Sequence, residues 1–236
     1  MGVHFAIAIR RRRANVVLLA CRSLRIKAMN IAILAWGSLI WCPGSLRIRT
    51  RWRSDGPLLP IEFARISQDD RLTLVIQPGS ADQPTYWAFS EFTILKDARD
   101  NLKVREKSKS SDIHHVLRDG SGVNDAPPEM ARRITEWAGQ HADIEAVVWT
   151  GLASNWREKR GRDFSPEDAV NFLLGLEAER DRAKATYDRA WEYVTNTPGV
   201  VDTAVRKTMR ARGWADASLP SILFEPALSA PKTESP

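Results

Sequence analysis

The chain has 236 residues, of which 43% are hydrophobic and 27% charged, a composition that fits one sizeable core or one domain with appendages. No apolar run approaches the ~20 residues that a membrane-spanning helix needs, so no membrane partner is expected. The two cysteines, Cys21 and Cys42, lack the spacing of a metal site or a disulfide framework. This cysteine usage fits a cytoplasmic protein, and neither a metal nor a cofactor is expected.

The formal charge of +6 is concentrated at the N-terminus. Of the 35 basic residues, seven lie in residues 1–28, which contain no acidic residue; residues 29–236 therefore hold 28 basic against 29 acidic residues, a net charge of −1. The basic excess belongs to an appendage and gives no indication that the domain binds nucleic acid.

Three interpretations of residues 1–28 stay open: a signal peptide, a basic targeting or membrane-surface arm, and an over-extended start ahead of a true initiator at Met29. The arginines follow Ile9, and the later apolar run at 16–21 is only six residues long, a pattern that disfavours a signal peptide. We favour the over-extended start and expect this appendage to be disordered or poorly packed.

The rest of the chain is organised around residues 31–41. The first half of this stretch is an apolar, partly β-branched run, which predicts a buried strand. The run breaks at Gly37-Ser38, where a residue without a Cβ lets a ligand approach the main chain. Free N–H groups and a hydroxyl after a buried strand suit an anionic or carbonyl group. An ordinary strand-to-loop turn is the alternative.

Two further strands carry charges of interest. Residues 46–53 alternate, with Leu46, Ile48, Thr50 and Trp52 on one side and arginines on the other, which predicts a half-exposed strand. Its arginine row is either a solvated face or a rim that attracts substrate. Residues 58–67 have apolar residues on both faces, with one charge on each face, Glu62 and Arg65, so we expect burial on both sides. A buried charge needs a partner or a function, which leaves a salt bridge or a pocket role for these two residues.

The remaining pattern alternates short strands with amphipathic helices. We expect further strands at 72–77, 86–89 and 145–150, loops at 78–84 and 107–125, and helices at 93–106, 127–140, 165–195 and 201–212. Adjacent histidines, His114 and His115, fall in the second loop without a carboxylate or cysteine cluster that would complete a metal site.

The predicted helix at 93–106 ends on a carboxylate. Leu95, Ala98 and Leu102 form its apolar stripe, and at about 100° per residue Glu106 projects only about 20° from Leu95. An inward position at a helix C-terminus, where the dipole disfavours negative charge, would raise the pKa of Glu106 toward the range useful for proton transfer. If the helix frays earlier, Glu106 lies in solvent instead.

The C-terminal half is mostly helical. Ser165 and Pro166 give an N-cap and a first-turn proline, and the helix that they open carries a heptad-like stripe, interrupted at Arg180, that we expect to pack on its own domain. We therefore divide the chain into the appendage, a domain at 29–160, a helical extension at 161–216 and a frayed tail at 217–236.

Strands first and helices afterwards indicate an α+β fold, or a small mixed β-barrel with helices outside. The chain contains no P-loop, no G-x-G-x-x-G and no G-x-S-x-G motif. Ser38 lacks a plausible histidine partner in the pattern and is not interpreted as a nucleophile.

Trp36-Gly37-Ser38-Leu39, directly after the first strand, resembles the Tyr-Gly-Ser-Leu signature of the gamma-glutamyl cyclotransferase-like proteins. Residues 102–106 (Leu-Lys-Val-Arg-Glu) resemble the segment that carries their catalytic glutamate, and the order and separation of the two motifs also fit. Trp-Gly-Ser-Leu-Ile-Trp, residues 59–67 and Val-Trp-Thr at 148–150 are similar to an uncharacterised bacterial branch of that superfamily.

This resemblance covers residues 31–150. It implies a small mixed β-barrel whose Gly37-Ser38-Leu39 loop holds a γ-glutamyl amine or peptide, while Glu106 moves a proton as the α-amine attacks the γ-carbonyl and 5-oxoproline is released. Two departures stand out: Trp36 replaces the usual tyrosine, and Lys107 takes the place of a glycine or apolar residue and could pair with Glu106.

Three hypotheses follow. The first is an enzyme of this chemistry, with Glu106 as general acid/base, with Trp36, Gly37, Ser38 and Leu39 as substrate-binding residues, and with Glu62 and Arg65 as further pocket candidates. The second is a non-catalytic small-molecule binding module of the same fold. The third is a nucleic-acid or membrane-surface binder that acts through residues 1–28. The sequence does not indicate an oligomeric state.

Overall fold

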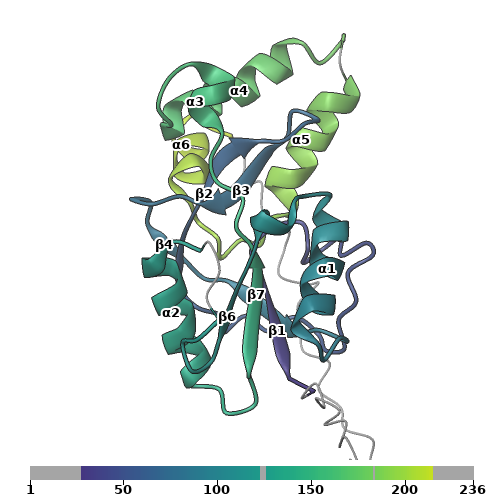
Figure 1. Ribbon diagram of the computed structural model, residues 1–236. Helices are drawn as coiled ribbons and strands as arrows, with labels where there is room; N and C mark the ends of the chain where they lie inside the picture. The colour runs from purple at the N-terminus through teal and green to yellow at the C-terminus, as the bar shows by residue number, and fades with distance from the viewer. Residues whose placement is uncertain (1–27, 123–125, 183, 215–236) are drawn as a thin grey trace, which may run out of the picture.

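The computed structural model describes residues 28–122, 126–182 and 184–214, and within these ranges it has two β-sheets and six α-helices (Figure 1). The predicted α+β class is confirmed. The strands are β1 (Ile31–Ala35), β2 (Leu59–Ile66), β3 (Leu72–Ile76), β4 (Asp82–Gln83), β5 (Tyr86–Phe89), β6 (Ile113–Leu117) and β7 (Ala146–Thr150). The helices are α1 (Leu95–Glu106), α2 (Pro128–Gly139), α3 (Trp156–Arg160), α4 (Pro166–Ala178), α5 (Lys184–Asn196) and α6 (Ala204–Ala211), with a 3-10 turn at Ser110–Asp112.

The larger sheet has four strands in the order β5-β1-β7-β6. β1 pairs in parallel with β7 and antiparallel with β5, and β6 is antiparallel to β7. All five residues of β1 are buried, as the continuous apolar run predicted, because a central strand with both faces covered presents no side to water. The end of β1 therefore lies deep in the molecule, and the loop that follows it opens from the core.

The helices α1 and α2 cover the two faces of this sheet (Figure 1). Ile31, Ile33 and Ala35 lie in one apolar cluster with Ala98 and Leu102 of α1. The alternate residues of β1 lie in a second cluster, which also contains the buried face of α2 and residues of β2 and β3. The alternation of a strand thus places successive side chains in different cores, and it fixes α1 on the face opposite α2.

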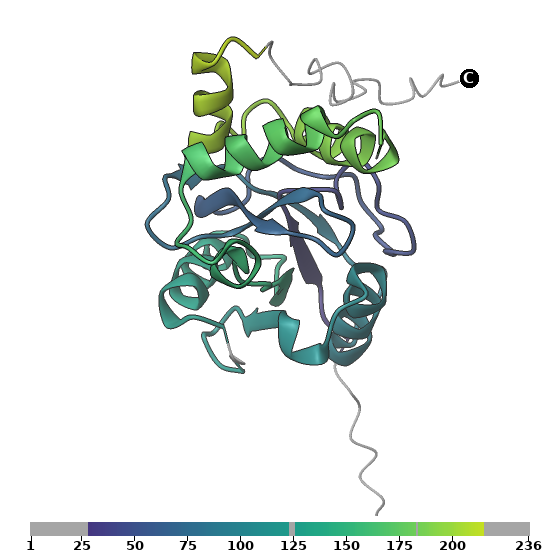
Figure 2. The ribbon, with the colours of Figure 1, turned by 90° about the horizontal axis from the view of Figure 1, so that it is seen from above.

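The smaller sheet has the order β3-β2-β4, and the C-terminal helices pack against it. α4 and α6 contact β2, and α5 contacts β3. Seen from above, α4 and α5 form a layer over these strands (Figure 2). Nearly all of β2 is buried, so the prediction that both of its faces are covered is confirmed. Within the described residues the strands form two separate sheets, and the small closed barrel is not confirmed.

The strand predicted at 46–53 is wrong. The segment touches the sheet at isolated bridges, Ile48 with Ser90 and Arg53 with Trp87. Between them the Thr50 hydroxyl accepts a hydrogen bond of 2.9 Å from the backbone N–H of Phe89, so a side chain takes the place of a ladder carbonyl. The arginines of the row are exposed, as the solvated-face interpretation predicted. The guanidinium carbons of Arg47, Arg49 and Arg53 also lie over aromatic rings, 5.2, 4.8 and 4.6 Å from the ring centroids.

The loop predicted at 107–125 contains a strand. β6 pairs with β7 over five positions, and His114 on it is buried against Trp149, with ring centroids 5.8 Å apart. The polar composition of the segment hid this strand, because pairing with a distant partner outweighs local propensity. The short strand β4 and the short helix α3 were also not predicted.

The single helix predicted at 165–195 is two helices. α4 begins at the predicted cap, where the Ser165 hydroxyl accepts a hydrogen bond from the backbone N–H of Asp168, but it ends at Ala178. Arg180, which interrupts the apolar stripe, lies in the turn between the two helices. By turning back there, the chain places the apolar faces of α4 and α5 on β2 and β3. The last helix, α6, begins at Ala204 instead of at 201.

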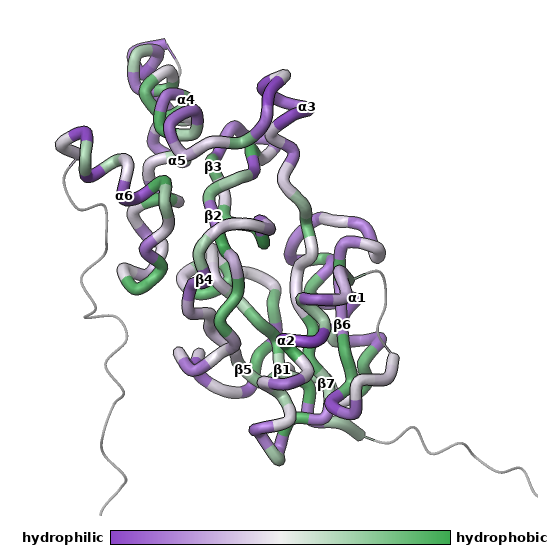
Figure 3. Tube along the Cα trace, turned by 90° about the vertical axis from the view of Figure 1, so that its left-hand side faces the viewer, coloured by the Kyte–Doolittle hydropathy of each residue, from purple (hydrophilic) through white to green (hydrophobic). Residues whose placement is uncertain are grey.

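Hydrophobic residues gather along β1 and β7, whereas α3 is largely hydrophilic (Figure 3). In the parts of the chain that the structure describes, no helix is both long enough and apolar enough to cross a membrane. The expectations for residues 1–27 and for the tail at 217–236 lie outside the described residues.

Candidate functional site

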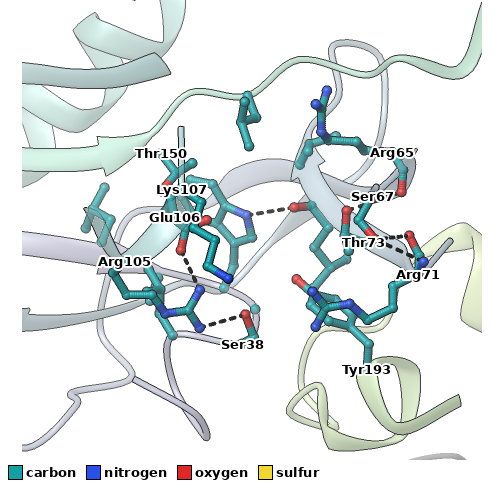
Figure 4. Close-up of a pocket in the computed structure, with 18 residues that line it drawn as sticks. Ser38, Arg65, Ser67, Arg71, Thr73, Arg105, Glu106, Lys107, Thr150 and Tyr193 are labelled. Atoms are coloured by element: carbon teal, nitrogen blue, oxygen red, sulfur yellow. Dashed lines mark hydrogen bonds and ion pairs between the residues drawn. The ribbon is translucent and has the colours of Figure 1, made fainter. Parts of the chain in front are cut away.

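A cavity of about 350 Å³ opens at the C-terminal end of β1, between the two sheets and α5. It brings together segments that are far apart in the sequence: the loop after β1, the turn between β2 and β3, the end of α1 and the last turn of α5 (Figure 4). The lining residues that matter for the chemistry are Trp36, Gly37, Ser38, Leu39, Arg65, Arg71, Arg105, Glu106, Lys107 and Tyr193. Of the residues selected from the sequence, Glu62 alone does not line it.

The loop after β1 forms one wall of the cavity. The backbone N–H of Ile40 donates to the Gly37 carbonyl at 3.0 Å, and that of Cys42 donates to the Ser38 carbonyl at 2.8 Å, so the loop turns tightly. The Trp36 indole N–H donates to the Leu74 carbonyl at 3.4 Å, which connects the larger sheet to β3. The predicted turn after the buried strand is therefore present, and its hydroxyl and main chain face the cavity.

Gly37 lines the cavity, and the fold gives it a steric reason to be glycine that the sequence did not indicate. A Cβ at this position would lie 2.2 Å from the Tyr193 hydroxyl oxygen, far inside contact distance. The ring of Tyr193 packs edge-on against Trp41 and Phe63, with centroids 5.3 and 6.4 Å apart. A tyrosine of the C-terminal helices thus occupies the space that the missing Cβ leaves.

Glu106 is the last residue of α1, and its side chain is 18% exposed. Burial raises the pKa of the Glu106 carboxyl, and the positive charges of Arg105 and Arg71 oppose this rise. The helix does not fray before Glu106, since Lys107 ends it in the left-handed conformation with φ of 50°. The inward position predicted from the helical stripe is observed, and the cause of the higher pKa is burial.

The partner of Glu106 is Arg105 and not Lys107. Arg105 Nη1 lies 2.9 Å from Glu106 Oε1. Its Nη2 donates to the Ser38 hydroxyl at 3.0 Å and to the Cys42 carbonyl at 2.7 Å. One guanidinium therefore connects the candidate catalytic carboxylate to the loop after β1, and it fixes the distance between the two halves of the site.

Positive charge surrounds the single carboxylate. Arg65, Arg71, Arg105 and Lys107 line the cavity together with Glu106. Arg65 Nη1 donates to the Ala153 carbonyl at 2.7 Å, a neutral partner that leaves its charge uncompensated. Such a cavity favours a ligand that carries negative charge.

Glu62 has a structural role away from the cavity. Its Oε1 accepts a hydrogen bond from the backbone N–H of Phe63 and its Oε2 accepts one from that of Ala204, both at 2.8 Å. Burial raises the pKa of the Glu62 carboxyl, and a hydrogen bond from the Thr203 side chain opposes this rise more than the backbone contacts do. The prediction of Glu62 as a pocket residue is therefore wrong, because the carboxylate is turned toward the N-terminus of α6.

Sequence reasoning missed Arg71, Arg105 and Tyr193. Arg71 follows the turn at 67–70, and Tyr193 lies on an apolar helical stripe, where an aromatic residue indicates only a core position. A signal for Arg105 was available, because it immediately precedes the selected Glu106. Tyr193 had no local signal, since its contact with Gly37 depends on the path of the whole chain.

Comparisons with protein-family models, with curated proteins and with solved structures give no match to this chain. Within the residues described, no group of three or more His, Cys, Asp or Glu side chains is arranged to hold a metal ion. The geometry of the cavity is therefore what bears on function.

Proposed function

We propose that the protein is a gamma-glutamyl cyclotransferase-like enzyme that acts on a γ-glutamyl amine or peptide, with Glu106 as general acid/base. The observation that carries the proposal is that the half-buried Glu106 carboxylate and the Gly37-Ser38-Leu39 loop, selected independently in the sequence, line one cavity. Trp36 and Arg65 line it as well. The barrel form of the domain and its cytoplasmic location belong to this proposal as expectations.

The chemistry needs one group that accepts and returns a proton. A carboxylate at position 106 takes a proton from the α-ammonium group, and the freed amine nitrogen attacks the γ-carbonyl carbon. A new C–N bond closes the five-membered ring, and Glu106 returns its proton to the departing nitrogen as the original C–N bond breaks. The second proton of the attacking nitrogen passes to the departing nitrogen by way of Glu106 in the same manner, so the amine leaves as an ammonium ion. The products are 5-oxoproline and a free amine or peptide. A pKa raised by burial suits this exchange, because it brings the carboxyl closer to the operating pH.

The loop after β1 and the surrounding cations would orient the substrate. The backbone N–H groups of Gly37 and Leu39 and the Ser38 hydroxyl are suited to the γ-carbonyl oxygen, on which negative charge develops during attack. The arginines of the cavity are suited to the carboxylate of a γ-glutamyl group.

A non-catalytic binding module of the same fold is the second candidate. The observation in its favour is the 2.9 Å ion pair between Arg105 and Glu106, because a carboxylate held by a guanidinium is a weaker base. In that case the cavity binds the ligand and turnover does not occur.

The deciding experiment uses the full chain and a panel of γ-glutamyl amines and peptides. We expect release of 5-oxoproline by the parent protein and its loss, by a factor of about 100 or more, in Glu106→Gln, since general acid/base catalysis contributes about 10²–10⁴-fold. Glu136→Gln on the exposed face of α2 is the matched control and should behave as the parent.

No release by a folded parent protein, together with binding of panel members, would favour the binding module. Unchanged release in Glu106→Gln would exclude Glu106 as the general acid/base.

A further inference from the structure

A second, smaller cavity of about 100 Å³ adjoins the first. The two cavities share Ser38, Arg71, Arg105 and Tyr193, so these residues form the wall between them. Arg71 and Tyr193 lie together, with the guanidinium carbon 5.8 Å from the ring centroid. Figure 4 shows them across the cavity from Glu106 and Lys107, so a ligand that extends across the cavity from Glu106 can reach this pair.

Asp69 orients the Arg71 guanidinium through only one of its three nitrogens. Its Nε donates to Asp69 Oδ1 at 3.1 Å, and Asp69 in turn accepts a hydrogen bond of 2.6 Å from the Ser67 hydroxyl. The two terminal nitrogens of Arg71 form no hydrogen bond with the residues that the structure describes. A planar guanidinium held by Nε presents those terminal nitrogens in the geometry that a carboxylate binds.

The Tyr193 hydroxyl is held in a fixed position beside this guanidinium. Its oxygen lies against Gly37, where a Cβ would be 2.2 Å away, and it receives hydrogen bonds from the backbone N–H groups of Leu74 and Ser38. Burial, assisted by the negative charge of Glu106, raises the pKa of Tyr193 to about 12, so the phenol keeps its proton at neutral pH. With backbone donors on the oxygen, the O–H hydrogen is available to an acceptor in the cavity.

We propose that Arg71 and Tyr193 form a subsite that binds a carboxylate of the ligand. The arginine supplies charge and paired donors, and the tyrosine supplies a neutral hydroxyl whose position is set by the loop after β1. The helix α5 is then part of the binding site. A ligand whose carboxylate is replaced by a carboxamide should bind less tightly, because an amide carries no charge for Arg71.

This inference rests on the proposed function for the choice of ligands, but it is tested by binding and not by turnover. Calorimetry would compare 5-oxoproline with 5-oxoprolinamide, and γ-glutamylglycine with γ-glutamylglycinamide, the second pair on Glu106→Gln so that no reaction occurs. Arg71→Gln and Tyr193→Phe are the test variants, and Arg157→Gln, with a side chain that is 77% exposed on α3, is the matched loss of charge.

We expect the acid of at least one pair to bind about tenfold or more tightly than its amide, the factor typical of a hydrogen bond to a charged group. Arg71→Gln should remove that preference by weakening only the acid, Tyr193→Phe should weaken the acid several-fold, and Arg157→Gln should change neither. Equal affinity for acid and amide, or an acid preference that survives Arg71→Gln, would overturn the subsite.

Failure of this inference and failure of the proposed function give different experimental results. Release of 5-oxoproline without a preference for acids would leave the enzyme and exclude the subsite. An acid preference that depends on Arg71 without any release would support the subsite and favour the binding module over the enzyme. A folded parent protein that binds none of the four compounds would overturn both.

A fold control addresses the contact with Gly37. Gly37→Ala should displace Tyr193 and weaken binding, whereas Gly37→Ala/Tyr193→Phe should recover most of the thermal stability, because the oxygen at 2.2 Å is gone and only the ring carbon at 3.3 Å remains near the added Cβ. The subsite requires that binding of the acid stays weak in this double variant. Recovery of acid binding along with stability would show that Tyr193 is only a packing residue.

Discussion

At the scale of single residues, the pKa of Glu106 is set by two opposing effects, its burial and the nearby guanidinium of Arg105. Burial of Glu106 favours its neutral form, and Arg105 at 2.9 Å favours its charged form. Burial dominates, so the pKa of Glu106 is raised. This balance decides between the two candidate functions, because a general acid/base needs a proton that it can exchange, and an ion-paired anchor does not.

The raised pKa of Glu106 predicts how the free energy of unfolding changes with pH. A carboxyl whose pKa is higher in the folded than in the unfolded state contributes stability that is complete below the ordinary value of 4.5 and is lost as the pH rises through the folded pKa. Glu106→Gln has no such proton to lose. We therefore expect the variant to gain stability relative to the parent as the pH rises above 4.5, by about 1.4 kcal/mol for each pH unit by which the pKa is raised.

Urea unfolding of both proteins between pH 4 and pH 8 measures this difference. In Glu136→Gln, whose carboxylate is exposed, the difference from the parent should show no comparable upward trend. A difference that falls with pH for Glu106→Gln would mean that Arg105 outweighs burial, which would favour the binding module.

At the scale of elements, a buried arginine holds α5 in place. Arg206 of α6 is 5% exposed, and its Nη2 donates to the carbonyls of Val194 and Thr197 at 2.7 and 2.6 Å. Its Nη1 donates to the carbonyls of Pro198 and Val201. The carbonyls at the C-terminal end of a helix have no partners within that helix, so this single side chain satisfies the end of α5 close to Tyr193.

We predict that Arg206→Met lowers the free energy of unfolding by about 3 kcal/mol or more, since buried acceptors lose their donors at about 1–3 kcal/mol each. Arg210→Met one helical turn later should cost no more than about 1 kcal/mol, because its pair with Asp202 is about 41% exposed. Chemical denaturation of both variants measures the contrast. Equal losses would show that the network around Arg206 does not carry this stability.

Sequence patterns predicted elements whose signals are local. The apolar run of β1, the stripe of α1 and the cap of α4 at Ser165 are all present. The sequence patterns failed where contacts between distant segments decide the secondary structure. β6 forms in a polar segment because β7 pairs with it. The single helix predicted at 165–195 is instead two helices, and the chain turns back between them at residues 179–182. For the same reason Glu106 could be selected from its own helix, whereas Tyr193 could not.

At the scale of the whole molecule, the C-terminal helices complete a core that the strands begin. Residues of α4, α5 and α6, such as Val170, Val194 and Met209, are buried in one apolar cluster with Phe63 of β2 and Leu72 of β3. Each such aliphatic side chain contributes about 1.5–3 kcal/mol on burial, and the net stability of a domain is only about 5–15 kcal/mol. We therefore expect the helices to be needed for folding as well as for the site.

We predict that a chain of residues 29–214 unfolds cooperatively and that one of residues 29–162 does not. The shorter chain leaves the apolar face of β2 and β3 uncovered, which exposes a patch prone to aggregation. Calorimetry and light scattering distinguish the two chains. A cooperative, monomeric 29–162 would contradict this account of the core.

The contact between Gly37 and Tyr193 joins two positions that lie in different parts of the chain. A larger residue at 37 is compatible with the fold only if residue 193 loses its hydroxyl or moves, so substitutions at the two positions are not independent. In any set of sequences that share this architecture, glycine after the first strand should occur together with tyrosine on the penultimate helix. Covariation of the two positions in aligned sequences would therefore test the contact without an assay.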